Sequence, residues 1–280
     1  MSYQEFRPSS YKLLPDVIKN LLIINVIIWL AQEVFADKLG LNLNMRYGLY
    51  FPGSENFSPI QYVTHLFLHG GFLHILSNMF ALWMFGTVLE NFWGSKRFLI
   101  YYAITGLGAA FMHTLFTWYE ISQLQSMIDA YAVSPNVMDF ITLMKSNSMY
   151  LRGESLQAIN AFVNEWEYSP DNSRMGSQSL VFAQELVTNK MNIPTVGASG
   201  AVFGVLLAFG MLFPNTVIYL YFAIPVKAKY FVIIYGLFEL YSGFANNPGD
   251  NIAHFAHLGG MLFGFILIKY WNKKNRSQFY

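Results

Sequence analysis

The sequence has no cysteine and few charged residues. Among its 280 residues there is no Cys, and Asp, Glu, Lys and Arg together make up 12%. The missing cysteines exclude disulfides, a thiol nucleophile and a cysteine metal site. A soluble domain normally carries about 25% charged residues. The low charge, together with 54% hydrophobic residues, therefore predicts a membrane protein.

The charge distribution and the first residues exclude two further classes. A formal net charge of +1 does not indicate nucleic-acid binding, and no basic patch is interleaved with base-stacking aromatic residues. We therefore expect no nucleic-acid partner. The chain begins with a polar stretch, and its first apolar segment is long and lacks a small-residue cleavage site, so we expect no cleavable signal peptide.

Long apolar runs are abundant. The first is long enough to cross about 30 Å of hydrocarbon, and five more candidates follow it. The six predicted spans are residues 17–35, 72–92, 98–116, 199–213, 230–244 and 252–271. The predicted fold is an all-α integral membrane protein in contact with the lipid bilayer. It is a six-helix bundle over residues 15–271, with tails at 1–14 and 272–280.

Residues 117–194 interrupt this pattern with a polar, acidic segment that contains no run long enough to cross a membrane. Part of it shows apolar residues at spacings of three and four, as in an amphipathic helix. These residues are Leu156, Ile159, Phe162, Val163 and Trp166. Ser134-Pro135 marks the start of another short helix. We expect a folded, helical, extramembranous insertion. Residues 216–224 are predicted to be loop or interfacial, and 244–250 a loop.

Lysine and arginine predict the orientation, because cytoplasmic loops are enriched in them. With the N-terminus inside, the inner side holds eleven of these residues and the short outer loops hold two, Lys38 and Arg46. The eleven are Arg7, Lys12, Lys19, Lys96, Arg97, Lys227, Lys229, Lys269, Lys273, Lys274 and Arg276. Four more in the insertion are discounted, since long segments translocate regardless of charge. Both termini are predicted to be cytoplasmic, the insertion to face outward, and the location to be a bacterial inner membrane.

Ser199 begins the fourth span within the run Gly197-Ala198-Ser199-Gly200. Flanking glycines leave its hydroxyl uncovered, and the N–H groups of the first helical turn lie beside it. An acyl-transfer nucleophile needs such a setting, because those amides can meet oxyanion charge. Small residues are also typical of close contacts between membrane helices. This run alone leaves both interpretations open.

Other polar residues are predicted to lie at the same depth as Ser199. In the predicted orientation the second, fourth and sixth spans all start at the outer face. The second carries His74 and Asn78 near its start, and the sixth carries His257. Polar groups inside membrane spans are expensive, and they are functional by default. The convergence of three helices predicts an active site there.

Chemistry assigns a role to each group. A serine is a poor nucleophile until an imidazole takes its proton, and His257 is the best candidate base. Gly260 and Gly264 allow its helix to approach the small stripe Gly200, Gly204 and Ala208, which would deliver His257 to Ser199. Phe203, one turn beyond Ser199, is placed to stack on the imidazole.

The oxyanion donors follow from helical spacing. His74 and Asn78 are four residues apart and share one helix face, so both can donate to an oxyanion together with the Ser199 N–H. No carboxylate is well placed as a third member, because Asp250 belongs to a loop. We therefore predict a serine–histidine dyad. Glu239 in the fifth span has no assigned role.

Taken together, these motifs resemble the rhomboid family of intramembrane serine proteases, over roughly residues 17–271 apart from the insertion. They are Gly197-Ala198-Ser199-Gly200-Ala201-Val202-Phe203-Gly204, His69 with His74 and Asn78, Glu90 with Gly94-Ser95-Lys96-Arg97-Phe98, and Ala256-His257 with Gly260 and Gly264. The resemblance implies cleavage of transmembrane or near-membrane segments of other membrane proteins, without a cofactor. It makes Ser199 the nucleophile, His257 the base, and His74 and Asn78 the oxyanion donors.

The sequence departs from the family pattern in three places. Phe203 stands where the family often has tyrosine, which keeps ring stacking but removes the hydroxyl. A tryptophan–arginine pair of the first loop is missing, and Met45-Arg46 is its nearest counterpart. The long insertion leads directly into Ser199, so we expect it to gate or shape access for the substrate.

Several alternatives stay in view. A transporter would show inverted repeats and broken helices, which the sequence lacks, and an inactive relative that binds membrane proteins would usually have lost the serine or the histidine. His65 and His69 are four apart but have no third ligand, so hydrogen bonding is favoured over a metal site. His254 lacks the glycine spacing that favours His257.

Three further polar residues are predicted to be structural. His113 is expected to be an interfacial or packing residue. Glu90 and Arg97 are expected to form an ionic or capping cluster. The abundant methionines and aromatic residues are interpreted as core and lipid-facing material that implies no cofactor.

Overall fold

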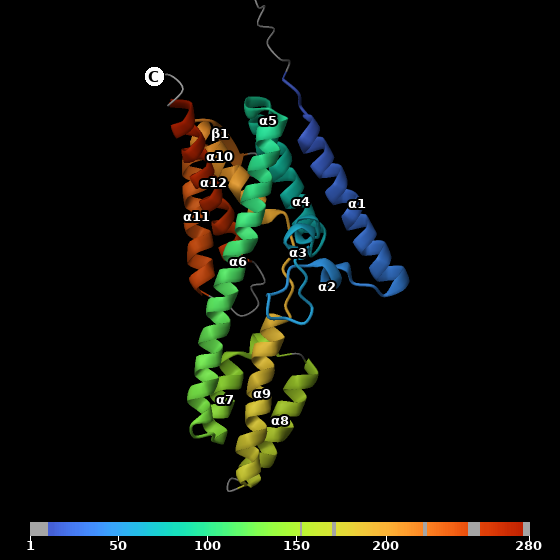
Figure 1. Ribbon diagram of the computed structural model, residues 1–280, viewed down its shortest axis with the longest axis vertical. Coiled ribbons are helices and arrows are strands. Elements are labelled where there is room, and N and C mark those ends of the chain that lie inside the picture. Colours follow the sequence, from blue (N-terminus) through green and yellow to red (C-terminus); the bar gives the residue numbers. More distant parts are fainter. Residues whose placement is uncertain (1–10, 152, 170–171, 221–222, 246–252, 277–280) are drawn as a thin grey trace, which may run out of the picture.

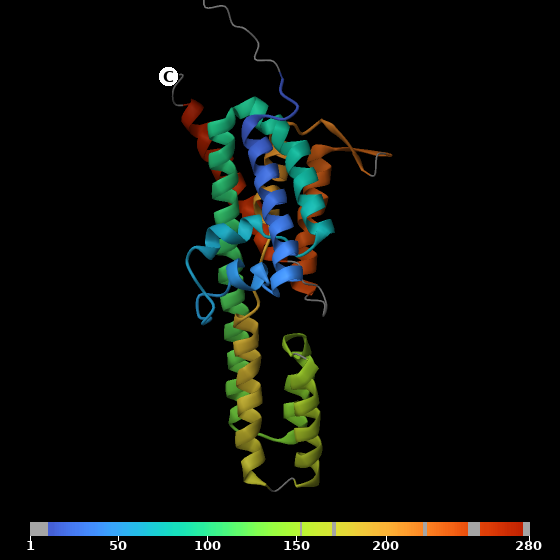
Figure 2. The ribbon, with the colours of Figure 1, turned by 90° about the vertical axis from the view of Figure 1, so that its right-hand side faces the viewer.

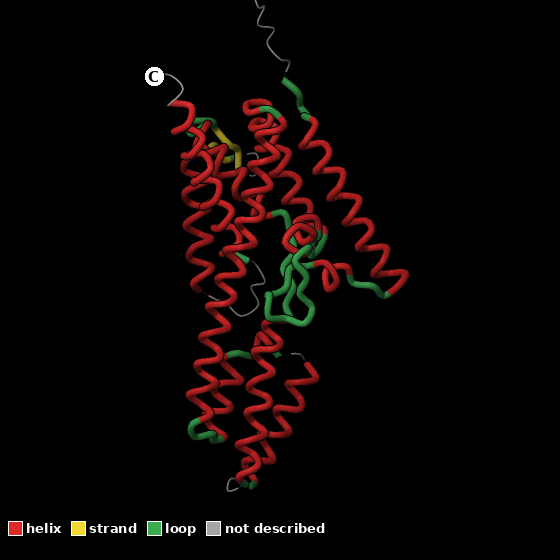
Figure 3. The backbone as a smooth tube through the Cα atoms, in the orientation of Figure 1, coloured by secondary structure: helices red, strands yellow, loops and turns green. Residues whose placement is uncertain are grey.

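The computed structural model describes residues 11–151, 153–169, 172–220, 223–245 and 253–276. Most of this is helix (Figure 3). Long helices form a bundle at one end of the molecule, and a helical extension leaves it at the other (Figures 1 and 2). The start of α1 and the end of α12 lie at the end of the bundle opposite to that extension.

A helix covers each of the six predicted spans. They are α1 (Asp16–Leu39), α4 (Phe72–Ala81) continuing through the π-helical turn Leu82–Gly86 into α5 (Thr87–Trp93), α6 (Ser95–Ala132), α10 (Ser199–Leu212), α11 (Ala228–Ala245) and α12 (His254–Arg276). By length and composition, α1, the α4–α5 unit and α6 can cross a membrane, and α10 is a shorter apolar helix. The predicted helical membrane bundle is confirmed. The count of six spans stays a prediction.

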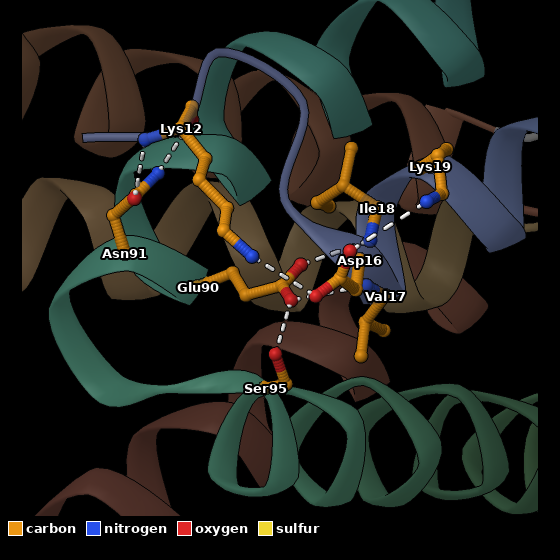
Figure 4. Close-up of polar contacts among 8 residues, drawn as sticks. All are labelled: Lys12, Asp16, Val17, Ile18, Lys19, Glu90, Asn91 and Ser95. Carbon is orange, nitrogen blue, oxygen red and sulfur yellow. Dashed lines mark hydrogen bonds and ion pairs between the residues drawn. The ribbon is translucent and has the colours of Figure 1, made fainter. Parts of the chain in front are cut away.

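The start of α1 is held by a side chain from α5 (Figure 4). Pro15 precedes the helix and offers no side-chain acceptor. Instead, the buried Glu90 carboxylate accepts the N–H groups of Val17 at 3.0 Å and Ile18 at 2.9 Å, and Ser95 Oγ donates to it at 2.6 Å. A carboxylate at a helix N-terminus meets both the free N–H groups and the helix dipole. The capping role predicted for Glu90 is confirmed.

Arg97 takes no part in this cap among the contacts that the structure describes. Its guanidinium carbon lies 4.2 Å from the centre of the Trp271 ring and 5.6 Å from that of Trp93. These cation–π contacts join α6 to α12 and to the end of α5.

The third predicted span is longer than expected. α6 runs unbroken for 38 residues, so the boundary placed at residue 117 falls inside a helix. That boundary was placed where the sequence becomes more polar. A helix continues as long as its backbone hydrogen bonds form, and polar residues support these bonds as well.

The rest of the insertion is helical, as predicted. It comprises α7 (Val137–Ser146), a 3₁₀ turn (Ser148–Tyr150), α8 (Gly153–Tyr168) and α9 (Ser173–Met191). The side chain of Asn136 caps α7 by accepting the Asp139 N–H at 3.0 Å. The insertion has its own apolar core, separate from that of the bundle. Buried members of that core include Leu124, Phe140, Ile159, Phe162, Trp166 and Leu186.

The stretch after α10 is a hairpin, which the prediction of a loop or interfacial segment missed. β1 (Val217–Leu220) pairs antiparallel with β2 (Ile224–Lys227), and Val217 lies opposite Lys227. β-branched residues favour strands. The short run before Pro225 is apolar throughout, however, and lacks the alternation of apolar and polar residues that predicts a strand. Most of the loop predicted at 244–250 lies outside the described residues.

Glycines allow close contact among three helices. The sequence predicted that the small residues of the fourth and sixth spans would pack only against each other. A Cβ on Gly260 would lie 1.8 Å from the Gly200 carbonyl oxygen, so α10 and α12 touch backbone to backbone there, as predicted. Gly204 and Gly264 instead face α6, at Thr105 and Tyr101. Tyr101 donates its hydroxyl to the Gly204 carbonyl at 2.8 Å. The junction thus joins α6, α10 and α12.

Candidate active site

Ser199 is the first residue of α10, and the backbone before it is tightly fixed. Gly197 has φ of 130°, and a Cβ there would lie 2.8 Å from the His74 ring. Its N–H donates to the His65 carbonyl at 2.9 Å, and Thr195 exchanges two backbone hydrogen bonds with Leu49. Glycine is required at residue 197 both for its conformation and for space.

The Ser199 hydroxyl lies 2.8 Å from Nε2 of His257, on the first turn of α12. The imidazole is stacked on Phe203, with ring centres 4.1 Å apart and planes 8° apart. This stacking is the contact that the sequence predicted for Phe203. His254, the alternative base, has a different contact: its Nδ1 faces a carboxylate on α11.

That carboxylate belongs to Glu239, and it corrects the prediction that no acid reaches His257. Its Oε2 lies 2.8 Å from His257 Nδ1 and 2.7 Å from His254 Nδ1, and the side chain is buried. An ionised carboxylate only accepts, so both Nδ1–H groups donate to it. In a neutral imidazole, His257 Nε2 is then left to accept the Ser199 hydroxyl.

His74 faces Gly197 from α4. The Gly70 N–H donates to His74 Nδ1 at 3.2 Å, so Nδ1 is the acceptor and the neutral ring carries its proton on Nε2. That nitrogen is one of the two His74 atoms closest to the missing Gly197 Cβ, which in turn would lie 3.6 Å from Ser199 Oγ. His74 therefore presents an N–H donor next to the serine.

Asn78 lies one turn further along α4 and is 5% exposed. Its amide nitrogen Nδ2 has no hydrogen-bond partner among the described residues. A buried unsatisfied donor costs about 1–3 kcal/mol. The cost is recovered when an acceptor enters the site, so this amide is suited to binding an anionic oxygen.

A cleft of about 1220 Å³ is lined by all seven of these side chains: His74, Asn78, Ser199, Phe203, Glu239, His254 and His257. Its walls come from the loop before α4, from α4, α6, α10, α11 and α12, and from the insertion, which contributes Met149, Tyr150 and Lys190. Lys190 is paired with Glu120 at 3.0 Å and donates to the Tyr150 hydroxyl at 2.6 Å. The site is large enough for several residues of a peptide and extends from the bundle to the insertion.

The remaining histidines make structural contacts. His65 Nδ1 bonds the Gln61 carbonyl at 2.8 Å, and burial lowers the pKa of His65 to about 4. The His69 backbone is bound on both sides by Gln32, at 3.1 and 3.0 Å, but neither ring nitrogen of His69 has a hydrogen-bond partner among the described residues. His113 Nε2 bonds Thr195 Oγ1 at 2.7 Å, next to the serine loop. Hydrogen bonding of His65, predicted in preference to metal binding, is present.

The Glu239 cluster also bears on the expected absence of a metal. Glu239, His254 and His257 each present one potential ligand atom, and these atoms lie within 4.8 Å of one another. The absence of a metal site stays a prediction. The separations of 2.7 and 2.8 Å are those of hydrogen bonds.

Fold and site together define a helical integral membrane protein with a serine–histidine pair in its interior. A model of the rhomboid domain matches residues 56–124 and 175–273. This is more than half of the chain, which therefore belongs to the rhomboid family. The matched ranges leave out residues 125–174, which hold α7 and α8.

Three relatives illustrate the similarity. The chain is 31% identical over 91 residues to the putative rhomboid protease YdcA of Bacillus subtilis, 25% over 269 residues to the mitochondrial RHOMBOID-like protein 12 of Arabidopsis thaliana, and 28% over 113 residues to the rhomboid protease AarA of Providencia stuartii. These matches cover 32%, 94% and 39% of this chain, and 45%, 60% and 40% of the relatives. The chain thus spans about half the length of these curated relatives.

Glu239 belongs to the site, although no motif of the sequence assigned it a role. A carboxylate inside an apolar span is itself a signal, because it is expensive there without a partner. Glu239 lies six residues before the end of α11, and His257 three residues after the start of α12. Both residues thus lie within two turns of the connection between the helices, but the side of α11 that Glu239 faces depends on packing.

Proposed function

We propose that this chain is an intramembrane serine endopeptidase that cleaves transmembrane or juxtamembrane segments of other membrane proteins. The hydrogen bond of 2.8 Å between Ser199 Oγ and His257 Nε2 carries the proposal. It joins an uncovered nucleophile to a base in the orientation that accepts the hydroxyl proton. An inactive relative has no need of this pairing, so the contact supports an enzyme over a binding factor.

The reaction would proceed by acyl transfer. Ser199 attacks the scissile carbonyl while His257 takes its proton, and the oxyanion is met by His74 Nε2–H, Asn78 Nδ2 and the Ser199 N–H. His257 then protonates the leaving amine. Water enters the cleft and hydrolyses the acyl-enzyme by the same steps, with no cofactor.

Membrane placement follows the charge asymmetry. We propose that both termini are cytoplasmic and that the insertion faces the outer side, with six helices crossing a bacterial inner membrane. The shared end of the bundle at which α1 starts and α12 ends supports this topology (Figure 1). Water would then reach Ser199 from the outer face.

A probe and a model substrate test the function. Purified protein is incubated with a fluorophosphonate and, separately, with a transmembrane polypeptide, and wild type is compared with Ser199→Ala and His257→Ala. We expect labelling and cleavage by wild type and loss of both in each variant. Failure of wild type to label or cleave, or equal cleavage by Ser199→Ala, rejects the protease assignment.

A further inference from the structure

Glu239 extends the serine–histidine pair to a chain of four side chains from three helices. We propose that Glu239 is a positioning residue: it holds His257 in the tautomer and orientation that activate Ser199, and His254 fixes the carboxylate in turn. This inference rests on the proposed function. It replaces the expected dyad with a serine–histidine–glutamate triad.

The His257 ring is held at one face and at both of its nitrogens. Phe203 stacks on one face at 4.1 Å, Ser199 lies at Nε2, and Glu239 lies at Nδ1. Stacking restrains the ring plane but does not distinguish the two nitrogens. Only the carboxylate does so, because it requires a proton at Nδ1 and thereby leaves Nε2 free to accept.

Burial also argues for a role beyond packing. Glu239 is 3% exposed within an apolar helix, and replacement of a whole buried ionic cluster by well-packed apolar residues is often neutral or stabilising. A purely structural position would favour an apolar residue. A carboxylate is useful here because a positive charge forms on His257 during the reaction.

The charges balance through the cycle. As the bond from Ser199 Oγ to the carbonyl carbon forms, the hydroxyl proton moves to His257 Nε2, and the carbonyl electron pair becomes the oxyanion. Glu239 stays ionised beside the resulting imidazolium. When the C–N bond breaks, the same proton passes to the leaving nitrogen and His257 is neutral again.

His254 has a distinct part. Its Nδ1–H donates to the same Oε2 atom that His257 uses. His254 and His257 are three residues apart on α12, so both face α11. Two donors on one oxygen fix the carboxylate more firmly than one, and they tie α11 to α12 beside the nucleophile.

A divalent metal is the competing interpretation of this cluster. Nitrogen and oxygen ligands of tetrahedral zinc lie about 2.0–2.2 Å from the metal, which puts neighbouring ligand atoms about 3.3 Å apart. The observed separations of 2.7 and 2.8 Å are shorter. The geometry therefore favours shared protons over a shared metal.

Kinetics on the full-length protein in detergent test the triad. Glu239→Gln and Glu239→Ala are compared with wild type for kcat, KM and melting temperature on a fluorogenic transmembrane peptide. We expect kcat to fall about 10²–10⁴-fold in both variants, with KM within about twofold. The melting temperature should stay close to wild type in Glu239→Gln, whose amide oxygen still accepts a hydrogen bond, and fall in Glu239→Ala, which leaves two buried N–H donors without an acceptor. His254→Gln should lower kcat by a smaller factor.

Glu90→Gln is the matched control. It makes the same substitution at a second buried carboxylate, whose contacts are with Val17, Ile18 and Ser95 far from the cleft. We expect a lower melting temperature and a kcat close to wild type. The opposite pattern in the two variants separates positioning of His257 from a structural effect.

Chemical rescue keeps the proposal testable if Glu239→Gln folds poorly. Glu239 lines the cleft, so formate can occupy the space left by Glu239→Ala. Formate should restore part of kcat in a concentration-dependent way, and uncharged formamide should not. A structural role alone predicts no difference between the two.

Three results would overturn the triad. They are a wild-type kcat in Glu239→Gln, equal rescue by formamide, and loss of wild-type activity on addition of 1,10-phenanthroline, which would indicate a metal. Fluorophosphonate labelling distinguishes this failure from failure of the protease itself. If wild type labels and cleaves, only the triad is rejected; if wild type does neither, both proposals are rejected.

Discussion

Asn78 combines burial, a place on the cleft wall and an amide without a partner among the described residues. In the resting protein such a donor is a cost, and on binding it becomes a gain. The same balance applies to Glu239, whose charge is expensive until His257 is protonated. At the scale of single residues, the proposed reaction would give both groups the partner that they lack in the free protein.

Replacement of Asn78 tests the oxyanion role. Asn78→Ala should lower kcat/KM by about 10²–10³-fold, since one oxyanion donor is lost, while thermal stability stays the same or rises. Steady-state kinetics and a thermal melt measure both. Asn25→Ala is the control, because Asn25 is fully buried in α1 and donates to Leu21. Equal kcat losses in both variants would contradict the oxyanion assignment.

Sequence reasoning reached Ser199, His257, His74 and Asn78 because each lies at the start of a span, where depth can be counted from the loop. Glu239 lies inside the fifth span and not at its start, and its partner depends on how α11 is rotated. The rotation of a helix about its axis can be predicted when one face is polar. The fifth span is apolar on most of its surface, so its rotation depends on packing against neighbouring helices.

At the scale of elements, backbone contact between α10 and α12 sets the distance from Ser199 to His257. The Gly260 face touches the Gly200 carbonyl directly. The sequence predicted this approach from small-residue spacing. It did not predict that Gly204 and Gly264 serve α6, because a small residue shows that something comes close and not which helix does.

Substitution of Gly260 tests this contact. Gly260→Ala should force α10 and α12 apart, with a cost of about 3 kcal/mol from overpacking and loss of Ser199 labelling as His257 moves away. Gly236→Ala is the control, because its nearest neighbour is the flexible side chain of Met261 at 3.2 Å. Thermal melts measure the loss of stability, and fluorophosphonate labelling rates measure the loss of Ser199 reactivity. A normal labelling rate in Gly260→Ala would contradict the proposed dependence.

At the scale of the whole molecule, two apolar cores are joined by one helix. The core of the bundle and that of the insertion share no buried residue. The insertion nevertheless borders the cleft, through Tyr150 and Lys190. Periodicity predicted α8, and Ser134-Pro135 predicted a helix close to the start of α7. The reach of the insertion into the cleft depends on tertiary packing.

Weakening of the insertion core separates substrate selection from chemistry. Phe140→Ala removes a fully buried ring that packs on Phe162 and Trp166, at a cost of about 3–5 kcal/mol to the insertion. We expect faster proteolysis of the insertion and altered cleavage of a protein substrate, with an unchanged rate of Ser199 labelling. Phe98→Ala, in the core of the bundle, should lower labelling instead. Lost labelling in folded Phe140→Ala would mean that the insertion builds the active site itself.

α6 gives this arrangement a fixed dimension. Its 38 residues extend about 57 Å, nearly twice the hydrocarbon thickness of a bilayer, without a hinge between bundle and insertion. The height of the insertion above Ser199 is therefore constant. In the proposed endopeptidase, a polypeptide bound to the insertion at one point and to Ser199 at another would have a fixed length of chain between the two points. The bond that is cleaved would then be set by its distance along the chain from the point of binding.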